Sequence, residues 1–307
     1  MRSSGTLMCI GSGAAFGAMA IFGKLAYENG ANVGTLLTVR FVLAAVLFWM
    51  LALAGRALVA ELRALAPRDI AIALGLGAAG YSLQAGSYFA ALERIDASLL
   101  SLLLYTFPAM VAVAAVALGR ERLTPRRLTA LALASAGLVL VLAGAGAGSI
   151  DALGAGLALG AAVVYSTYIL VSDGVAARVR PGLLSALVCT GAAVSLTAST
   201  ALLGQLRPAE LTGAGWGWLA ALALVSTVVA IALFFAGLRR VGPTTASILA
   251  TIEPVVTVLL AFAVFGETLG PVQLVGGGFV VAAVLALNVR LPRSRWLAAR
   301  LAADPAR

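Results

Sequence analysis

YTFPAMVAVAAVALGRE, residues 105–121, and TIEPVVTVLLAFAVFGE, residues 251–267, are two versions of one apolar segment. In each version a proline interrupts a long apolar run, and a glutamate follows 13 residues later. Pro108 and Pro254 lie 146 residues apart, and so do Glu121 and Glu267. A repeat at about half the chain length indicates that the chain contains two related halves.

The composition predicts an all-α integral membrane protein. Of the 307 residues, 62% are hydrophobic and 11% are charged, and the mean hydropathy is +1.06. Globular domains carry about 25% charged residues, and runs of about 20 apolar residues are typical of membrane-spanning helices. We predict ten such helices, at residues 7–27, 33–53, 70–92, 97–118, 128–144, 152–171, 183–203, 216–238, 243–265 and 272–289. The short connections leave no room for a soluble catalytic or nucleotide-binding module.

The net charge of +9 is explained by membrane topology rather than by a nucleic-acid partner. Most of the 21 lysines and arginines fall in loops on one side of the predicted membrane, whereas Lys24, Arg94 and Arg207 fall on the other and Arg40 lies within a helix. The positive-inside rule therefore predicts an inner (plasma) membrane protein with both termini in the cytoplasm. The basic tail, residues 291–307, is expected to lie near lipid headgroups on that side.

The two halves are predicted to have opposite orientations. The glycine spacing of residues 11–17 recurs at residues 154–160, so each repeat holds five helices, one in residues 1–146 and one in residues 147–290. Because five is odd, the second repeat must enter the membrane from the opposite side. An inverted repeat is typical of secondary transporters, in which related halves open a central site to each side in turn.

These features resemble the drug/metabolite transporter superfamily, in its ten-helix form with two tandem EamA repeats. The resemblance covers roughly residues 5–290 and rests on Arg40-Phe41, on Pro108 with Glu121 and Pro125, and on Glu253-Pro254 with Glu267 and Pro271. The combination of spans, duplication and motifs is specific for the superfamily but not for a substrate. The resemblance implies a carrier of small metabolites, and we favour the subgroup that exports amino acids, including aromatic ones.

Polar residues inside the predicted spans mark a candidate binding cavity, because polar groups in a bilayer need protein or water beside them. Residues 98, 101 and 105 share one helical face, and residues 244, 247 and 251 repeat this pattern 146 positions later. The alternative for these polar groups is that they join neighbouring helices by hydrogen bonds. The alternative for the tyrosines in the predicted set is that they pack in the helical core. The predicted substrate-binding residues are Tyr81, Gln84, Tyr88, Ser101, Tyr105, Tyr165, Tyr168, Ser247 and Thr251.

Prolines and charges complete the candidate set. Pro108 and Pro254 lie near the predicted midplane, where we expect them to bend helices and act as hinges, with ligand contact through freed carbonyls as the alternative. Glu253 is a candidate for binding an amine or carrying a coupling proton, or else a structural partner of a neighbouring helix. Lys24 and Arg40 are candidates for attracting the carboxylate of a substrate. The alternative is that they only anchor their helices in the membrane. Glu121 and Glu267 are expected to cap or gate helix ends.

The predicted function is secondary export of neutral or aromatic amino acids through a midplane cavity. An exporter of cationic drugs or polyamines that uses Glu253 is the alternative. A membrane-embedded enzyme is disfavoured, because the chain has no histidine, no metal-ligand cluster and no paired deep carboxylates. We expect no cofactor and no metal. The expected partners are a small-molecule substrate and the lipid bilayer; one chain is expected to form a complete pathway, with a homodimer left open.

Overall fold

The computed structural model describes residues 2–54, 61–118, 125–144, 151–176, 178–241, 249 and 252–288, and this part of the chain is helical without any strand. Helices are expected, because a backbone in lipid must satisfy its hydrogen bonds internally. The first half contains α1 (Arg2–Gly17), α2 (Met19–Glu28), α3 (Val33–Ala54), α5 (Pro67–Gly75), η1 (Leu76–Tyr81), α6 (Ser82–Leu92), α7 (Ala97–Leu104), α8 (Phe107–Ala117) and α9 (Pro125–Gly144). The second half contains α10 (Ala152–Ala176), α11 (Pro181–Leu202), η2 (Pro208–Glu210), α12 (Gly213–Ala223), η3 (Leu224–Val229), α13 (Ala230–Val241), α15 (Ile252–Phe265) and α16 (Pro271–Asn288).

The protein passes through the membrane several times. Within the described residues, five helical stretches are long and apolar enough to cross a bilayer: Ser4–Glu28, Val33–Leu51, Ala152–Ser172, Pro181–Leu202 and Gly213–Phe234. Shorter apolar helices follow at Ile252–Phe265 and Pro271–Ala283. Four predicted spans are interrupted in the described part of the chain. Residues 7–27 are divided into α1 and α2, and residues 97–118 into α7 and α8. Residues 70–92 pass through α5, η1 and α6, and residues 216–238 pass through α12, η3 and α13.

Local sequence signals explain where the helices begin. A proline opens α5, α9, α11 and α16, which suits the first helical position, where no intrahelical donor is required. The side chain of Thr212 caps α12 by accepting a hydrogen bond from the Gly215 N–H at 3.1 Å. Asp151 caps α10 in the same way, accepting from the Gly154 N–H at 2.6 Å.

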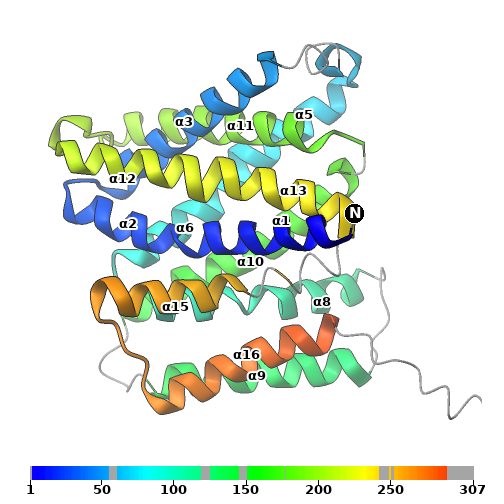
Figure 1. The fold of residues 1–307 in the computed structure, drawn as a ribbon, viewed down its shortest axis with the longest axis vertical. Coiled ribbons are helices and arrows are strands. Elements are labelled where there is room, and N and C mark those ends of the chain that lie inside the picture. The colour runs from blue at the N-terminus through cyan, green and yellow to red at the C-terminus, as the bar shows by residue number, and fades with distance from the viewer. Residues whose placement is uncertain are drawn as a thin grey trace, which may run out of the picture.

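Helices of the first half pack mainly against helices of the second. The largest contacts join α9 with α16, α1 with α13, α3 with α11, and α6 with α10. Figure 1 shows the α9–α16 pair at one edge of the bundle and α3 with α11 toward the opposite edge. We call the end of the bundle that carries the N-terminus the proximal end, and the end where α2 gives way to α3 the distal end (Figure 1).

Helices α1 and α10 run in opposite directions. The chain leaves the proximal end in α1 and reaches the distal end at the close of α2 (Figure 1). Arg94, just after α6, contacts Asp151, just before α10, at 3.4 Å. Glu267, just after α15, contacts the start of α7. The loops that contain Arg94, Asp151 and Glu267 therefore all lie at the distal end. Helix α10 begins there and runs toward the proximal end, opposite to α1 (Figure 1).

Two π-helical segments interrupt the bundle at related places. The segment η1 and the segment η3 begin 148 residues apart. A π-turn inserts an extra residue and changes which side chains face a given direction, and such turns are frequent at functional sites. At the crossing of η1 with α11, a Cβ on Gly77 would meet the Val188 carbonyl, and one on Gly191 would meet the Leu74 carbonyl. Glycine is therefore required for the two backbones to approach this closely.

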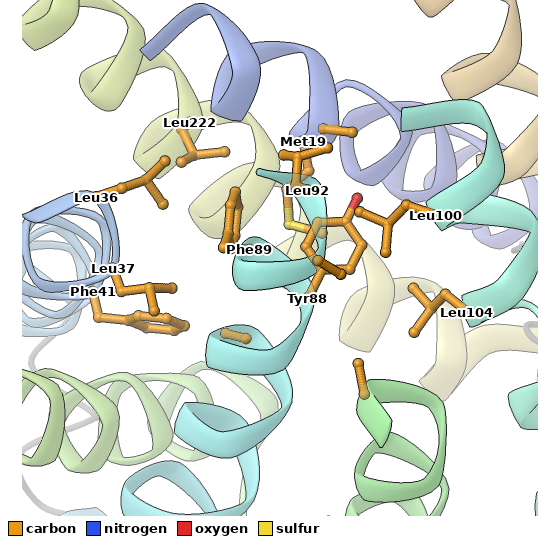
Figure 2. Packing of buried hydrophobic residues seen from close by; sticks show 14 of the residues in the cluster. Met19, Leu36, Leu37, Phe41, Tyr88, Phe89, Leu92, Leu100, Leu104 and Leu222 are labelled. Atoms are coloured by element: carbon orange, nitrogen blue, oxygen red, sulfur yellow. The ribbon is translucent and has the colours of Figure 1, made fainter. Parts of the chain in front are cut away.

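The apolar core lies between α2, α3, α6, α7 and α12, where Figure 2 shows Phe41, Phe89 and Leu36 among the packed side chains. These three side chains are completely buried. Large apolar side chains such as Leu83 and Phe262 are instead exposed on the outside of the bundle. In a membrane protein, such exposed apolar surface faces the lipid tails.

Candidate substrate-binding cavity

A cavity of about 100 Å³ lies inside the bundle. Helices of both halves of the chain form its wall. The lining residues are Ser12, Gly13, Phe16, Met19, Tyr81, Gln84, Leu104, Tyr105, Phe107, Tyr165, Tyr168, Ser185, Val188, Ile231, Phe234 and Glu253. Small-molecule pockets commonly measure about 300–1,000 Å³, so this conformation suits a small ligand better than a drug-sized one.

A break between α7 and α8 contributes part of the wall. Helix α7 ends at Leu104 and α8 begins at Phe107, so Tyr105 lies in the break and Pro108 in the first turn of α8. Phe107, the first residue of α8, also connects this region to α10, because its carbonyl accepts a hydrogen bond from the Ser166 hydroxyl at 3.1 Å. Discontinuous helices at substrate sites are a recurrent feature of secondary transporters.

Aromatic rings form a continuous row along one side of the cavity. Phe107 contacts Tyr105 and Tyr165 with ring centroids 5.6 and 4.7 Å apart. Tyr165 lies 6.3 Å from Tyr168, which lies 5.7 Å from Tyr81 in an edge-to-face arrangement. Edge-to-face packing fixes ring orientation, so the hydroxyls and ring faces presented to the cavity are positioned before any ligand enters.

Glu253 supplies the carboxyl group of the cavity. It lies in the first turn of α15, and its Oε2 accepts a hydrogen bond from the Tyr105 hydroxyl at 3.2 Å. Among the described residues no lysine or arginine forms an ion pair with it. An intramembrane carboxyl that faces a cavity is expected to have a functional role.

Most of the sequence-predicted cavity residues that the structure describes do line the cavity. These are Tyr81, Gln84, Tyr105, Tyr165, Tyr168 and Glu253. Two others lie elsewhere: Tyr88 is buried against Phe89 with ring centroids 5.2 Å apart, and Ser101 is buried in α7. The stripe predicted for residues 98–105 assumes one continuous helix, and the break after Leu104 removes that register. Ser247 and Thr251 lie outside the described residues.

Arg40 is completely buried in α3 instead of lining the cavity. Its Nε donates a hydrogen bond to the Thr227 hydroxyl of η3 at 2.8 Å. Its guanidinium carbon lies 5.4 Å from the centre of the Phe89 ring, a cation–π arrangement. The Nη2 atom has no hydrogen-bond partner within the described part of the chain.

Lys24 is engaged at the distal end by two acidic residues. Its Nζ lies 2.7 Å from Glu267 Oε1 and 3.5 Å from Asp96 Oδ1. Glu267 also accepts from the Ser98 N–H at 3.2 Å and the Ser98 hydroxyl at 3.1 Å, and so it caps α7 as expected. Partial burial acts to raise the pKa of Glu267, but the bonds from Lys24, Ser98 and Ala97 outweigh it and hold the pKa below its ordinary value.

Small residues that carried no clear sequence signal also line the cavity. Ser12 and Ser185 lie in its wall, where their hydroxyls donate to the Ala230 carbonyl at 2.7 Å and the Pro181 carbonyl at 2.8 Å. Neither serine belongs to a helical stripe or has a polar counterpart in the other repeat. Pro254, buried in the first turn of α15, immediately follows Glu253.

The model of the EamA-like transporter family matches residues 3–143 and again residues 152–289. The chain belongs to this family. It is 27% identical over 294 residues to the uncharacterized transporter YcbK of Bacillus subtilis, covering 94% of each chain. It is 31% identical over 212 residues to an uncharacterized transporter of Archaeoglobus fulgidus, covering 69% of this chain and 74% of the relative.

Two further similarities are a partial sequence match and a shared fold. The threonine/homoserine exporter RhtA of Escherichia coli is 31% identical over 139 residues, which is 44% of each chain. A solved crystal structure matches 98% of this chain and 99% of its own with a TM-score of 0.63 at 21% identity, which shows a shared fold. This EamA-like protein is therefore a multi-pass membrane transporter and not an enzyme.

Proposed function

We propose that this EamA-like transporter exports neutral amino acids by alternating access around the cavity. The observation that carries the proposal is the chemistry of the wall: one carboxyl, Glu253, hydroxyl groups, and a row of aromatic rings. A carboxyl can accept an ammonium group, while an apolar wall accommodates an uncharged side chain. The cavity volume of about 100 Å³ favours small side chains such as that of threonine over aromatic ones.

We further propose that the chain forms ten membrane helices as two inverted five-helix repeats. The family match to two successive segments supports this arrangement. So do the opposite directions of α1 and α10 and the separation of η1 from η3. In such a repeat α1 corresponds to α10 and α6 corresponds to α13. The contact of α1 with α13 is then matched by the contact of α10 with α6, and both are observed. Related halves of opposite direction provide the two conformations that alternating access needs.

The proposal places the transporter in the inner membrane with both termini in the cytoplasm, as the distribution of lysine and arginine predicts. The proximal end then faces the cytoplasm and the distal end faces outward. Reporter domains fused to each terminus test the orientation: an intracellular fluorescent reporter is expected to be active at both ends, and a periplasmic phosphatase at neither. Since one chain forms the described wall of the cavity, a single chain is proposed to suffice for transport.

The test is flux into proteoliposomes with labelled phenylalanine, tryptophan, methionine, threonine, glutamate, putrescine and a quaternary-ammonium dye, each with and without a pH gradient. Saturable flux of neutral amino acids is expected. Tyr105→Ala should reduce it by about tenfold, because the hydrogen bond to the Glu253 carboxyl is lost. Ser247→Ala should also reduce it. Thr167→Ala is the matched control, since that exposed side chain lies on α10 outside the cavity. Wild-type flux in both Tyr105→Ala and Ser247→Ala, with normal folding, would contradict the proposal.

Export of cationic drugs or polyamines is a second candidate, favoured by one observation. Glu253 is an acidic group in the cavity without a described cationic partner, which suits a cation. The same panel separates the candidates: flux of only putrescine or the dye would support cation export. Glu253→Gln should abolish cation flux in that case, because Glu253 is the acidic side chain among the described lining residues of the cavity.

A further inference from the structure

The cavity wall contains an amide side chain that makes no hydrogen bond. Gln84 lies in α6, where it is half-buried and lines the cavity. Within the described part of the chain, neither the oxygen nor the nitrogen of its amide has a hydrogen-bond partner. A side-chain amide offers two N–H donors and a carbonyl acceptor. Leaving such a group unpaired inside a membrane-spanning bundle is costly, so this amide requires an explanation beyond packing.

The other polar groups of the wall differ from Gln84. The hydroxyls of Ser12 and Ser185 donate to backbone carbonyls at 2.7 and 2.8 Å, and the Tyr105 hydroxyl donates to Glu253 at 3.2 Å. Gln84 carries the only nitrogen donors among the described side chains that line the cavity. The described wall therefore presents a strong acceptor, the Glu253 carboxyl, and a free pair of N–H donors, the Gln84 amide.

Gln84 is held beside the row of aromatic rings. It follows Tyr81 by three positions, so the two side chains lie on the same face of the helix. Tyr81 contacts Tyr168 with ring centroids 5.7 Å apart, and α6 packs against α10, the helix that carries Tyr168. Helix α6 is unbroken from Ser82 to Leu92. The amide is therefore positioned by a regular helix, which fixes a binding group more accurately than a loop does.

Gln84 and Glu253 lie in different halves of the chain, on α6 and on α15. No hydrogen bond joins them in the described structure. Because both line one cavity of about 100 Å³, a small ligand can contact both at once. After accepting from Tyr105, an ionised Glu253 has further acceptor positions for an ammonium group, which has only donors. The Gln84 N–H groups are then available to the other end of the ligand.

We propose that the Gln84 amide donates hydrogen bonds to the carboxylate of the substrate while Glu253 accepts from its ammonium, so that Gln84 makes the cavity select amino acids over amines. This inference rests on the proposed function and assigns a residue that determines its specificity. A carboxylate that leaves water for the cavity needs donors to replace its lost hydrogen bonds, and the amide supplies them. A ligand without the carboxylate leaves the amide unpaired and is bound less tightly for that reason.

The test compares two ligands that differ by the carboxylate alone. They are threonine and 1-aminopropan-2-ol, which keeps the ammonium and the hydroxyl. Each competes with the flux of labelled threonine into proteoliposomes, and the ratio of the two competition constants is measured. If the panel identifies another neutral amino acid as the better substrate, that amino acid and its decarboxylated amine replace the pair. In the wild type, the amino acid should compete at least about tenfold better, as expected for a hydrogen bond to a charged group.

Three substitutions of Gln84 change its donors in different ways. Gln84→Leu removes the amide, and it should weaken competition by threonine about tenfold and leave 1-aminopropan-2-ol unchanged. Gln84→Glu replaces the N–H donors with a second acidic group, and it should weaken threonine at least as much and strengthen the amine. Gln84→Asn keeps an amide and should retain part of the preference. A side chain that only packs would instead change competition by both ligands by the same factor.

Gln205→Leu and Gln205→Glu are the matched controls. They make the same changes at an exposed glutamine outside the cavity, and their ratio of competition constants should equal that of the wild type. Where a folded variant carries no threonine, the ratio is measured from the concentration of each ligand that protects the protein against thermal unfolding.

The failures of the two proposals are distinguishable. If the wild type carries no neutral amino acid, the proposed function is wrong and this inference is wrong with it. If the wild type carries amino acids but Gln84→Leu and Gln205→Leu show the same ratio, only the inference is overturned. If Gln84→Leu fails to fold, Gln84→Glu decides, because it keeps a polar side chain of the same shape; a wild-type ratio in that variant overturns the inference.

Discussion

The contact between Glu267 and the start of α7 offers the most direct test of the energetics at the distal end. Four donors converge on this carboxylate: Lys24 Nζ at 2.7 Å, the Ser98 hydroxyl at 3.1 Å, the Ser98 N–H at 3.2 Å and the Ala97 N–H at 3.4 Å. The side chain of Glu267 is 10% exposed and that of Lys24 is 21% exposed. Glu267→Gln keeps the shape of the side chain but removes its charge, and it places an amide donor among these donors.

The expected loss of stability follows from these contacts. A hydrogen bond to a charged group contributes about 1.5–3 kcal/mol, and loss of a helix cap costs about 1 kcal/mol. These contributions overlap, so we expect Glu267→Gln to lower the free energy of unfolding by about 3 kcal/mol. At about 2 °C per kcal/mol for a large domain, the Tm in detergent should fall by roughly 6 °C.

The dependence on pH identifies the carboxylate as the cause. The folded state lowers the pKa of Glu267, so its contribution to stability is present above the unfolded pKa of about 4.3 and is lost as the pH falls through the lower folded value. The difference in Tm between wild type and Glu267→Gln should therefore be constant near neutral pH. It should shrink as the pH falls below about 4.

Two controls complete the measurement. Glu210→Gln removes an exposed carboxylate, also at the distal end, that pairs with Arg207 at 3.4 Å, and it should change the free energy of unfolding by less than about 1 kcal/mol. A cycle with Lys24→Met should show coupling between Lys24 and Glu267, because they share a bond. Equal Tm values for wild type and Glu267→Gln near neutral pH would refute the reasoning.

Two further outcomes concern helix packing. Gly77→Ala should destabilise the protein by more than about 1 kcal/mol, because the added Cβ would meet the Val188 carbonyl. Gly86→Ala is the control and should be neutral or stabilising, because nothing lies within 4 Å of its added Cβ. Thermal unfolding of both variants checks this, and equal Tm values for the two would contradict it. Thr190→Val should lower the free energy of unfolding by about 1 kcal/mol, because the Trp49 indole N–H loses its acceptor at 2.9 Å. The wavelength of Trp49 fluorescence emission should differ between the wild type and the variant, and an unchanged emission would contradict the prediction.

Several features of this protein follow from the sequence because they depend on local physics. A backbone in lipid must be helical, so long apolar runs predict membrane helices directly. The motif around Glu267 also predicts a helix-capping role, which the contacts with α7 confirm. Tyrosines at helical spacing in residues 81–88 and 165–168 point to one cavity, and three of them, Tyr81, Tyr165 and Tyr168, line it.

Other features are decided only when the helices pack. Tyr88 and Ser101 share sequence stripes with cavity residues, yet they lie in the packed core. Tyr88 lies in the continuous helix α6, so its burial is decided by the neighbours that pack along that helix. For Ser101 the cause is local, because the angular position of a side chain changes where a helix breaks, as after Leu104. A stripe drawn on an ideal continuous helix therefore misplaces residues beyond such points. The meeting of Arg40 with Thr227, 187 positions away, depends on the contact of α3 with η3, and no local pattern in the sequence encodes that contact.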